Sequence, residues 1–163
     1  NYKLIVDSLF SNWIPKGLKI HSIKGDGANL KDVAERYAKI LPKKIDILLL
    51  SLGEDGHIAS LFPYSSAMIN KSKMVLISDS PKPPSGRITI TQRVIHSAKQ
   101  VFLIVLGEEK GRVLAKSLSS PCDYNQLPVR LTIGRTWVLD KKATESFRQC
   151  APENYYNTEI IYA

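Results

Sequence analysis

The alternation of apolar and polar positions divides the chain into a series of helices and strands. Apolar residues recur at helical spacing over residues 2–13, which predicts an amphipathic helix that ends before Pro15. Asn29 is a suitable N-cap for a second helix, whose apolar stripe runs to Leu41 and which Pro42 ends. Further helices are expected after Thr91, over residues 108–118, and over residues 141–147 behind the cap Asp140.

Two apolar segments predict buried strands. Residues 45–52 are apolar on both faces apart from Asp46 and Ser51, and residues 101–106 are apolar throughout. Strands of this kind are typical of parallel sheets that helices cover. Shorter strands are expected at residues 19–23, 74–77, 87–91 and 136–139. Residues 129–133 fit a short helix or a strand, and the tail from Gln149 is expected to be loose or packed on a neighbour.

Strands that alternate with helices predict an α/β fold. We expect a three-layer, mostly parallel, open (Rossmann-like) sheet with helices on both faces, formed by residues 1–163 as a single domain. The chain contains no internal repeat and no interdomain linker.

Composition narrows the class of protein. The chain has 163 residues, of which 44% are hydrophobic, and this favours a globular domain. Its longest relevant apolar run, residues 101–106, is too short to span a membrane, and no basic segment followed by an apolar core marks a secretory signal. Because the chain begins with Asn rather than Met, we interpret it as a fragment. Cys122 and Cys150 make neither a disulfide framework nor a metal-binding pair, which favours a cytoplasmic protein.

The net charge of +8 raises the question of polyanion binding. The lysines are scattered singly and in pairs, without a basic run or interleaved aromatic residues. A solvated basic surface therefore explains the charge better than a nucleic-acid or membrane partner does.

The richest chemistry follows the apolar run 48–52, in a loop that contains Gly53, Asp55, Gly56 and His57. In an open α/β sheet, reactive groups gather outside the carboxyl ends of the strands. Glycines there permit positive φ angles and a close approach to a ligand. Asp55 and His57 can face one cleft only if the chain turns sharply at Gly56.

The whole stretch, Gly53-x-Asp55-Gly56-His57-x-Ala59-Ser60-Leu61-Phe62-Pro63, resembles the signature of the 6-phosphogluconolactonases. Three further stretches agree with that family in the same order: Pro83-Pro84-x-x-Arg87-Ile88-Thr89, Gly107-x-x-Lys110 and Trp137-x-x-Asp140. The glucosamine-6-phosphate deaminases share the fold and the Asp-Gly-His-Ile-Ala start, but they continue with Phe-Asn-Glu-Pro. The continuation Ser60-Leu61-Phe62-Pro63 is that of the lactonases.

The resemblance is incomplete at the N-terminus. Family members begin with a glycine-rich phosphate loop and an Asp-Glu-Arg segment, and neither is present here. The chain therefore corresponds to the C-terminal two-thirds of a family domain and lacks the family's N-terminal strands. If that segment is truly absent from the protein, we expect the chain to be inactive.

The resemblance implies hydrolysis of 6-phosphogluconolactone to 6-phosphogluconate, a step of the pentose phosphate pathway, with no cofactor and no metal. His57 is expected to be the general base that activates water, since an imidazole is neutral near pH 7 and still accepts a proton. Asp55 either orients His57 or forms an Asx-turn that holds the loop, and both roles are compatible. Backbone N–H groups around Gly53 and Gly56 are candidates for binding the oxyanion.

The 6-phosphate of the substrate requires fixed positive charge. Arg87 and Lys110 match the phosphate-binding positions of the family, and Lys110 falls in the first turn of a helix, where anions are favoured. For Arg87 to reach the same edge as His57, the strand 87–91 should run antiparallel to the strand 45–52. His21 and His96 have no partners at metal-ligand spacing and are interpreted as structural or surface residues.

Two other functions stay open from the sequence. One is a glucosamine-6-phosphate deaminase-like enzyme on the same fold, and the other is an inactive, basic binding module. Some members of the family are fused to glucose-6-phosphate dehydrogenase, so fusion or association with that enzyme is a further expectation.

Overall fold

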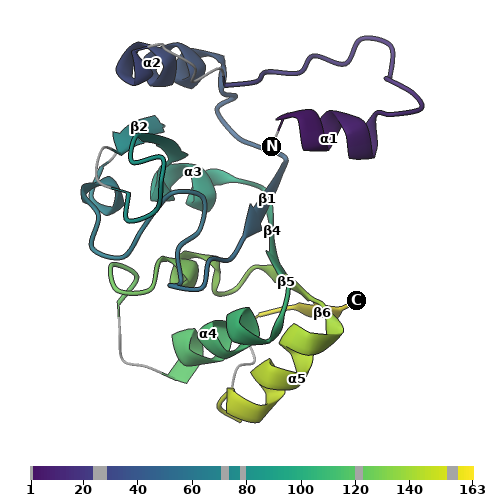
Figure 1. The fold of residues 1–163 in the computed structure, drawn as a ribbon, viewed down its shortest axis with the longest axis vertical. Helices are drawn as coiled ribbons and strands as arrows, with labels where there is room; N and C mark the ends of the chain where they lie inside the picture. Colours follow the sequence, from purple (N-terminus) through teal and green to yellow (C-terminus); the bar gives the residue numbers. More distant parts are fainter. Residues whose placement is uncertain (1, 24–28, 71–73, 78–79, 120–122, 154–157) are drawn as a thin grey trace.

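A four-stranded parallel sheet forms the centre of the molecule (Figure 1). The computed structural model describes residues 2–23, 29–70, 74–77, 80–119, 123–153 and 158–163. The strand order is β1-β4-β5-β6, with every neighbouring pair parallel. The strands are β1 (Ile47–Ser51), β4 (Gln100–Val105), β5 (Thr136–Leu139) and β6 (Ile160–Tyr162). The mostly parallel α/β fold expected from the sequence is confirmed.

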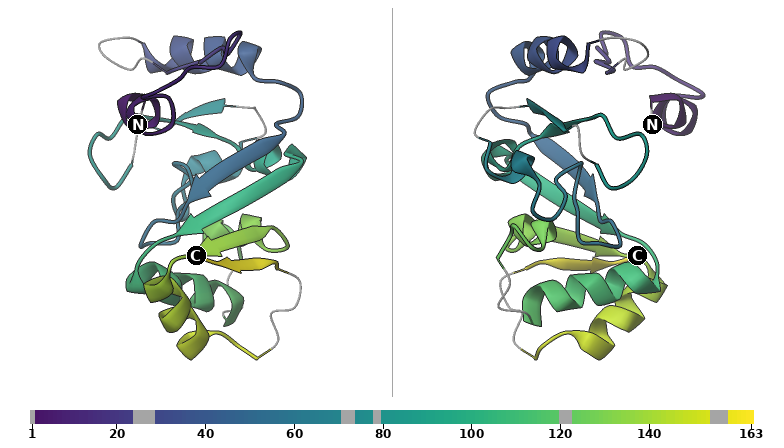
Figure 2. Two further views of the ribbon diagram at one scale, coloured as in Figure 1. Left: turned by 90° about the vertical axis from the view of Figure 1, so that its right-hand side faces the viewer. Right: turned by 60° about the vertical axis from the view of Figure 1, so that its left-hand side comes forward.

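A second, antiparallel sheet and a set of helices surround this centre. The small sheet pairs β2 (Met74–Ile77) with β3 (Arg87–Ile90). Figure 2 shows the first two helices at one end of the molecule and the last two at the other, with the parallel sheet between them. The helices are α1 (Tyr2–Leu9), α2 (Leu30–Ile40), α3 (Gln92–Ser97), α4 (Glu108–Ser119) and α5 (Lys141–Cys150), and 3-10 turns occur at Ser66–Met68 and Pro128–Thr132.

Helix caps agree with the sequence in two cases out of three. The Asn29 side chain accepts a hydrogen bond from the Lys31 N–H at 3.0 Å, and Asp140 accepts one from the Ala143 N–H at 2.8 Å. Thr91 precedes α3, but its side chain makes no capping bond.

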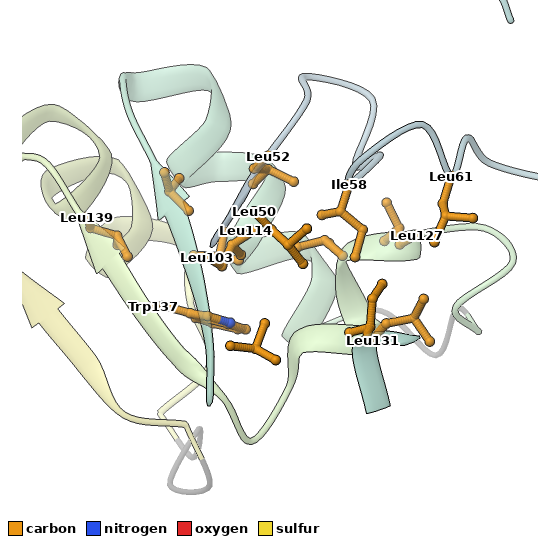
Figure 3. Close-up of a cluster of buried hydrophobic side chains, with 14 of the residues drawn as sticks. Leu50, Leu52, Ile58, Leu61, Leu103, Leu114, Leu127, Leu131, Trp137 and Leu139 are labelled. Carbon is orange, nitrogen blue, oxygen red and sulfur yellow. The ribbon is translucent and has the colours of Figure 1, made fainter. Parts of the chain in front are cut away.

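One face of the parallel sheet packs into the hydrophobic core (Figure 3). Leu103 and Trp137 point into it from neighbouring strands, and Phe147 of α5 meets the Trp137 ring edge to face, with centroids 6.2 Å apart. The indole N–H of Trp137 donates to the Thr132 carbonyl at 3.1 Å, so the buried polar atom is satisfied. The core extends to Ile58, which directly follows His57, and to Leu61.

The opposite face of β1 differs from the sequence prediction. Leu50 is the buried residue of that strand, whereas Ile47 and Leu49 are 58% and 62% exposed. The expectation that the segment 45–52 is buried on both faces is therefore wrong. β1 is an edge strand, and the described residues leave its second face largely open.

Three other expectations are corrected. Residues 19–23 form no strand, although their pattern alternates. The first helix ends at Leu9 rather than near residue 13, and its apolar residues pack into no core, since none is buried. The tail is not simply loose, because it supplies β6, which pairs with β5.

Candidate active site

Three loops meet at the carboxyl edge of the parallel sheet. The Leu52 N–H donates to the Ile104 carbonyl at 3.3 Å, and the Asp140 N–H donates to the Val105 carbonyl at 3.2 Å. The chain therefore leaves β1, β4 and β5 side by side, as parallel pairing requires. Loop 53–57, the start of α4 and the start of α5 consequently share one edge, the usual place for ligands in such folds.

Loop 53–57 is closed by its own backbone. The Gly53 N–H donates to the His57 carbonyl at 2.9 Å, and the Gly56 N–H donates to the Gly53 carbonyl at 3.1 Å. Gly56 has a φ of +86°, so the sharp turn that the sequence required is present. The same bonds engage the amides of Gly53 and Gly56, so neither amide is available to bind an oxyanion.

The turn brings the two chemically active side chains of the loop together. Asp55 Oδ1 accepts a short hydrogen bond from His57 Nδ1 and a second one, at 3.3 Å, from the His57 backbone N–H. Desolvation raises the pKa of Asp55, but the hydrogen bonds from His57 and the charge of its ring outweigh that effect and leave the pKa below its ordinary value. Because an ionised carboxylate has no proton to donate, the shared proton belongs to Nδ1. When the ring is neutral and Nδ1 carries its proton, Nε2 can accept a proton.

The imidazole ring of His57 packs against Phe62 and Gly53. Its ring centroid is 4.6 Å from that of Phe62, at an interplanar angle of 41°. On another side it lies against Gly53, where a Cβ atom would overlap the ring. The side chains of His57 and Asp55 remain 20% and 33% exposed, so the pair is held by protein yet reachable from solvent.

Two further segments support the loop, one at residues 127–129 and one in β3. The Val129 N–H donates to the Gly56 carbonyl at 2.9 Å, and a Cβ on Gly56 would lie 2.7 Å from Leu127 Cδ2. Thr89 Oγ1 accepts from the Ser60 N–H at 3.0 Å, which ties β3 to the stretch after His57. Thr89 belongs to the Arg-Ile-Thr stretch, but no sequence signal marked Leu127 or Val129.

Lys110 lies in the first turn of α4, which starts at the carboxyl edge of the sheet, and is half-buried. Farther along the helix, Val113 faces the loop, since a Cβ on Gly56 would lie 3.8 Å from Val113 Cγ1. Among the described residues, no hydrogen bond or ion pair joins the Lys110 ammonium group to Asp55 or His57.

Arg87 begins β3, which belongs to the small antiparallel sheet and not to the parallel one. β3 does not pair with β1, and its antiparallel partner is β2. The guanidinium donates from Nε to the Pro84 carbonyl at 2.9 Å and from Nη2 to the carbonyls of Pro83 at 3.1 Å and Lys82 at 3.3 Å. None of the contacts among the described residues joins Arg87 to His57 or Lys110.

The described residues show neither a metal-binding cluster nor a membrane-spanning helix. No group of three or more His, Cys, Asp or Glu side chains there is arranged to hold a metal ion. None of the helices in that part of the chain is long and apolar enough to cross a membrane.

These features define an α/β protein with a histidine–aspartate pair and a helix-borne lysine at the carboxyl edge of a parallel sheet. A family profile described as "Glucosamine-6-phosphate isomerases/6-phosphogluconolactonase" matches residues 1–139. The chain belongs to this family.

Individual relatives agree with that assignment. A probable 6-phosphogluconolactonase 2 from Oryza sativa subsp. indica is 32% identical over 90% of this chain and 61% of its own length. The 6-phosphogluconolactonase of Homo sapiens is 38% identical over 70% of this chain and 49% of its own length. The chain therefore spans less than two-thirds of these relatives.

Solved structures match the fold. The 6-phosphogluconolactonase of Thermotoga maritima superposes with a TM-score of 0.69 at 22% identity, covering 99% of this chain and 63% of its own. A monomeric glucosamine-6-phosphate deaminase gives the same TM-score at 20% identity, covering 88% of this chain and 66% of its own. At these identities the superpositions establish the fold alone.

Proposed function

We propose that the protein hydrolyses 6-phosphogluconolactone to 6-phosphogluconate, with His57 as general base. The observation that carries this proposal is the hydrogen-bonded Asp55–His57 pair, which leaves Nε2 as a proton acceptor at the carboxyl edge of the sheet. Relatives at 32–40% identity that are named as 6-phosphogluconolactonases support the choice of substrate.

In the proposed mechanism, water attacks the C1 carbonyl of the lactone while His57 Nε2 takes its proton. The bond between C1 and the ring oxygen then breaks, and the ring oxygen takes the proton that His57 Nε2 holds, which gives a hydroxyl group and restores the neutral imidazole. The product is a carboxylic acid that ionises at neutral pH. Asp55 holds the ring in the tautomer that can accept the proton and stabilises the imidazolium once it has formed.

Lys110 and Arg87 are proposed to bind the 6-phosphate. Lys110 combines its charge with the exposed N–H groups of the first turn of α4, where anions are favoured. In Arg87, Nε and Nη2 donate hydrogen bonds to the loop 82–84, and we propose that Nη1 binds the phosphate. The carbonyls of the loop 82–84 would hold the guanidinium in a fixed orientation.

Acid release from 6-phosphogluconolactone at neutral pH, corrected for spontaneous hydrolysis, tests the proposal in the full-length protein. His57→Ala should lower kcat by about 10²–10⁴-fold. His96→Ala is the matched control, because α3 leads into the amino end of β4, at the opposite edge of the sheet, and this variant should keep the wild-type rate. Equal rates for wild type and His57→Ala would remove His57 from the mechanism.

The deaminase alternative is not favoured by these relatives. Ammonia release from glucosamine 6-phosphate would reveal it directly. Strongly salt-dependent binding of polyanions without hydrolysis would instead identify a binding module.

Cellular location, partners and domain organisation are proposed separately. We propose a cytoplasmic enzyme on the basis of its cysteine usage, although one rice relative is named as chloroplastic. Association with glucose-6-phosphate dehydrogenase and the assignment of residues 1–163 to a single domain both stay predictions. Co-purification with the dehydrogenase tests the first, and limited proteolysis tests the second.

A further inference from the structure

A hollow of about 370 Å³ lies at the amino edge of the parallel sheet, between α3 and the segment that joins α2 to β1. The Lys99 N–H donates to the Ile45 carbonyl at 2.9 Å, and the Gln100 N–H donates to the Asp46 carbonyl at 3.0 Å. The chain therefore enters β1 and β4 side by side. Since α3 ends shortly before β4 and residues 41–45 lead into β1, the hollow is formed by the two entry segments.

The hollow is separate from the candidate active site. Loop 53–57 follows the carboxyl end of β1, whereas the hollow lies at the amino end of that strand. A strand of five residues such as β1 spans about 16 Å, at about 3.3 Å per residue. None of the residues that line the hollow belongs to the loop, to α4 or to α5. A ligand in the hollow would therefore touch neither His57 nor Lys110.

The lining of the hollow carries positive charge and no acid. Lys43 and Arg93 both line it and are exposed, and no Asp or Glu is among the lining residues. Among the described residues, neither of these two side chains makes a hydrogen bond or an ion pair. The nearest acid in the sequence, Asp46, is engaged with Lys99 at 2.6 Å. The hollow thus presents two cations that no described carboxylate neutralises.

The rest of the lining is mostly apolar. Its apolar members come from the segment before β1 and from α3: Leu41, Pro42, Ile45 and Val94. The remaining residue, Ser97, donates its hydroxyl proton to the Val94 carbonyl at 3.1 Å. The side-chain donors left in the hollow are therefore the two cations, beside an apolar surface on which a hydrophobic group could lie.

We propose that this hollow is a binding site for a small phosphate monoester that carries an apolar group. A phosphate dianion matches the two cations, because the Arg93 guanidinium offers a planar fork of N–H donors and the Lys43 ammonium group a point charge. The apolar lining would take the rest of the ligand out of water. The inference does not depend on the proposed lactone hydrolysis, since the two sites share no residue.

Calorimetry with phenyl phosphate as the probe tests this site in the full-length protein. Phenyl phosphate should bind about tenfold more tightly than inorganic phosphate, which lacks the ring, and than benzoate, which carries a single charge. Arg93→Gln and Lys43→Gln should each weaken its binding by about tenfold, because each removes a charged donor. Lys116→Gln removes the same charge from an exposed position on α4 and should leave the Kd unchanged.

A further variant separates the apolar contribution from the charge. Leu41→Ala should weaken the binding of phenyl phosphate and leave that of inorganic phosphate unchanged. Equal affinities for the two probes, or an equal loss of affinity in Lys116→Gln, would reduce the effect to attraction by the net positive charge of the protein and would overturn the inference.

NMR amide shifts locate the probe. Shifts within residues 41–45 and 92–98 that disappear in Arg93→Gln are the expected result. Shifts confined to loop 53–57 and residues 107–111 would place phenyl phosphate in the candidate active site and would also overturn the inference. Neither measurement uses lactone hydrolysis, so the proposed function and this site can fail independently.

Discussion

Replacement of Gly53 by alanine tests the most specific contact of the candidate site. A Cβ on Gly53 would overlap the Cε1 and Nδ1 atoms of the His57 ring. The φ angle of Gly53 lies outside the left-handed region, so alanine costs nothing through the backbone itself. The whole effect of the substitution should therefore pass through the imidazole.

The magnitude follows from what the ring can do. If it stays, the overlap costs about 1–3 kcal/mol of folding free energy, as overpacking of a filled site does. If it rotates away, the hydrogen bond to Asp55 is lost and the proposed base is displaced. Either way kcat should fall, by up to about 10²–10⁴-fold if general-base catalysis is lost entirely.

A double-mutant cycle checks the cause. In a His57→Ala background the space beside Gly53 is empty, and Gly53→Ala should be neutral or stabilise the protein by about 0.4–1 kcal/mol through the unfolded state. Urea unfolding of the four proteins and acid release by each give both readouts. Gly17→Ala controls for general destabilisation: a Cβ on Gly17 would meet nothing within 4 Å, but its φ of +85° makes alanine costly there, so stability should fall and activity should stay unchanged. Full activity and stability in Gly53→Ala would refute the placement of the ring.

Three further outcomes are expected. Lys110→Ala should raise KM by about tenfold to a hundredfold with a smaller change in kcat, because it removes the charged hydrogen bond that we propose Lys110 makes to the phosphate. Steady-state kinetics measures the change, and an unchanged KM would contradict the phosphate role. For Asp55, the folded-state pKa lies below the ordinary 3.8, so its contribution to stability is full well above pH 3.8 and is lost as the pH falls through the lower folded value. The difference in unfolding free energy between wild type and Asp55→Asn should accordingly shrink in acid, and a difference that grows there would show the opposite sign. Gly111→Ala should destabilise the protein by about 1–3 kcal/mol, because the new methyl group would overlap Ser146 between α4 and α5. Thermal unfolding measures this loss of stability. A wild-type Tm would show that the two helices can move apart without cost.

Elements with strong local patterns could be predicted from the sequence. The strand 101–106 and the helix 108–118 correspond closely to β4 and α4, because their apolar periodicity matches the environment they occupy. β6 was missed because a strand of three residues depends on its pairing with β5, which is not a local property. Residues 19–23 show the converse: they alternate, but they find no strand partner among the described residues.

The part of the candidate site that lies within one short stretch of sequence could be predicted. Asp55 and His57 are two residues apart with a glycine between them, so their pairing followed once Gly56 turned. Gly53 was interpreted as a place where a ligand approaches the backbone, whereas it makes room for the imidazole. The hydrogen bonds of Arg87 to the loop 82–84 depend on the path of that loop, and no spacing rule gives such a path.

The unpaired edge and exposed face of β1 should affect the association state of the 163-residue chain in solution. Ile47 and Leu49 face solvent on a strand whose outer hydrogen-bonding groups have no strand partner among the described residues. Edges of this kind recruit strands from other molecules. Expressed by itself, the chain should self-associate with rising concentration, and a lysine in place of Leu49 should keep it dispersed.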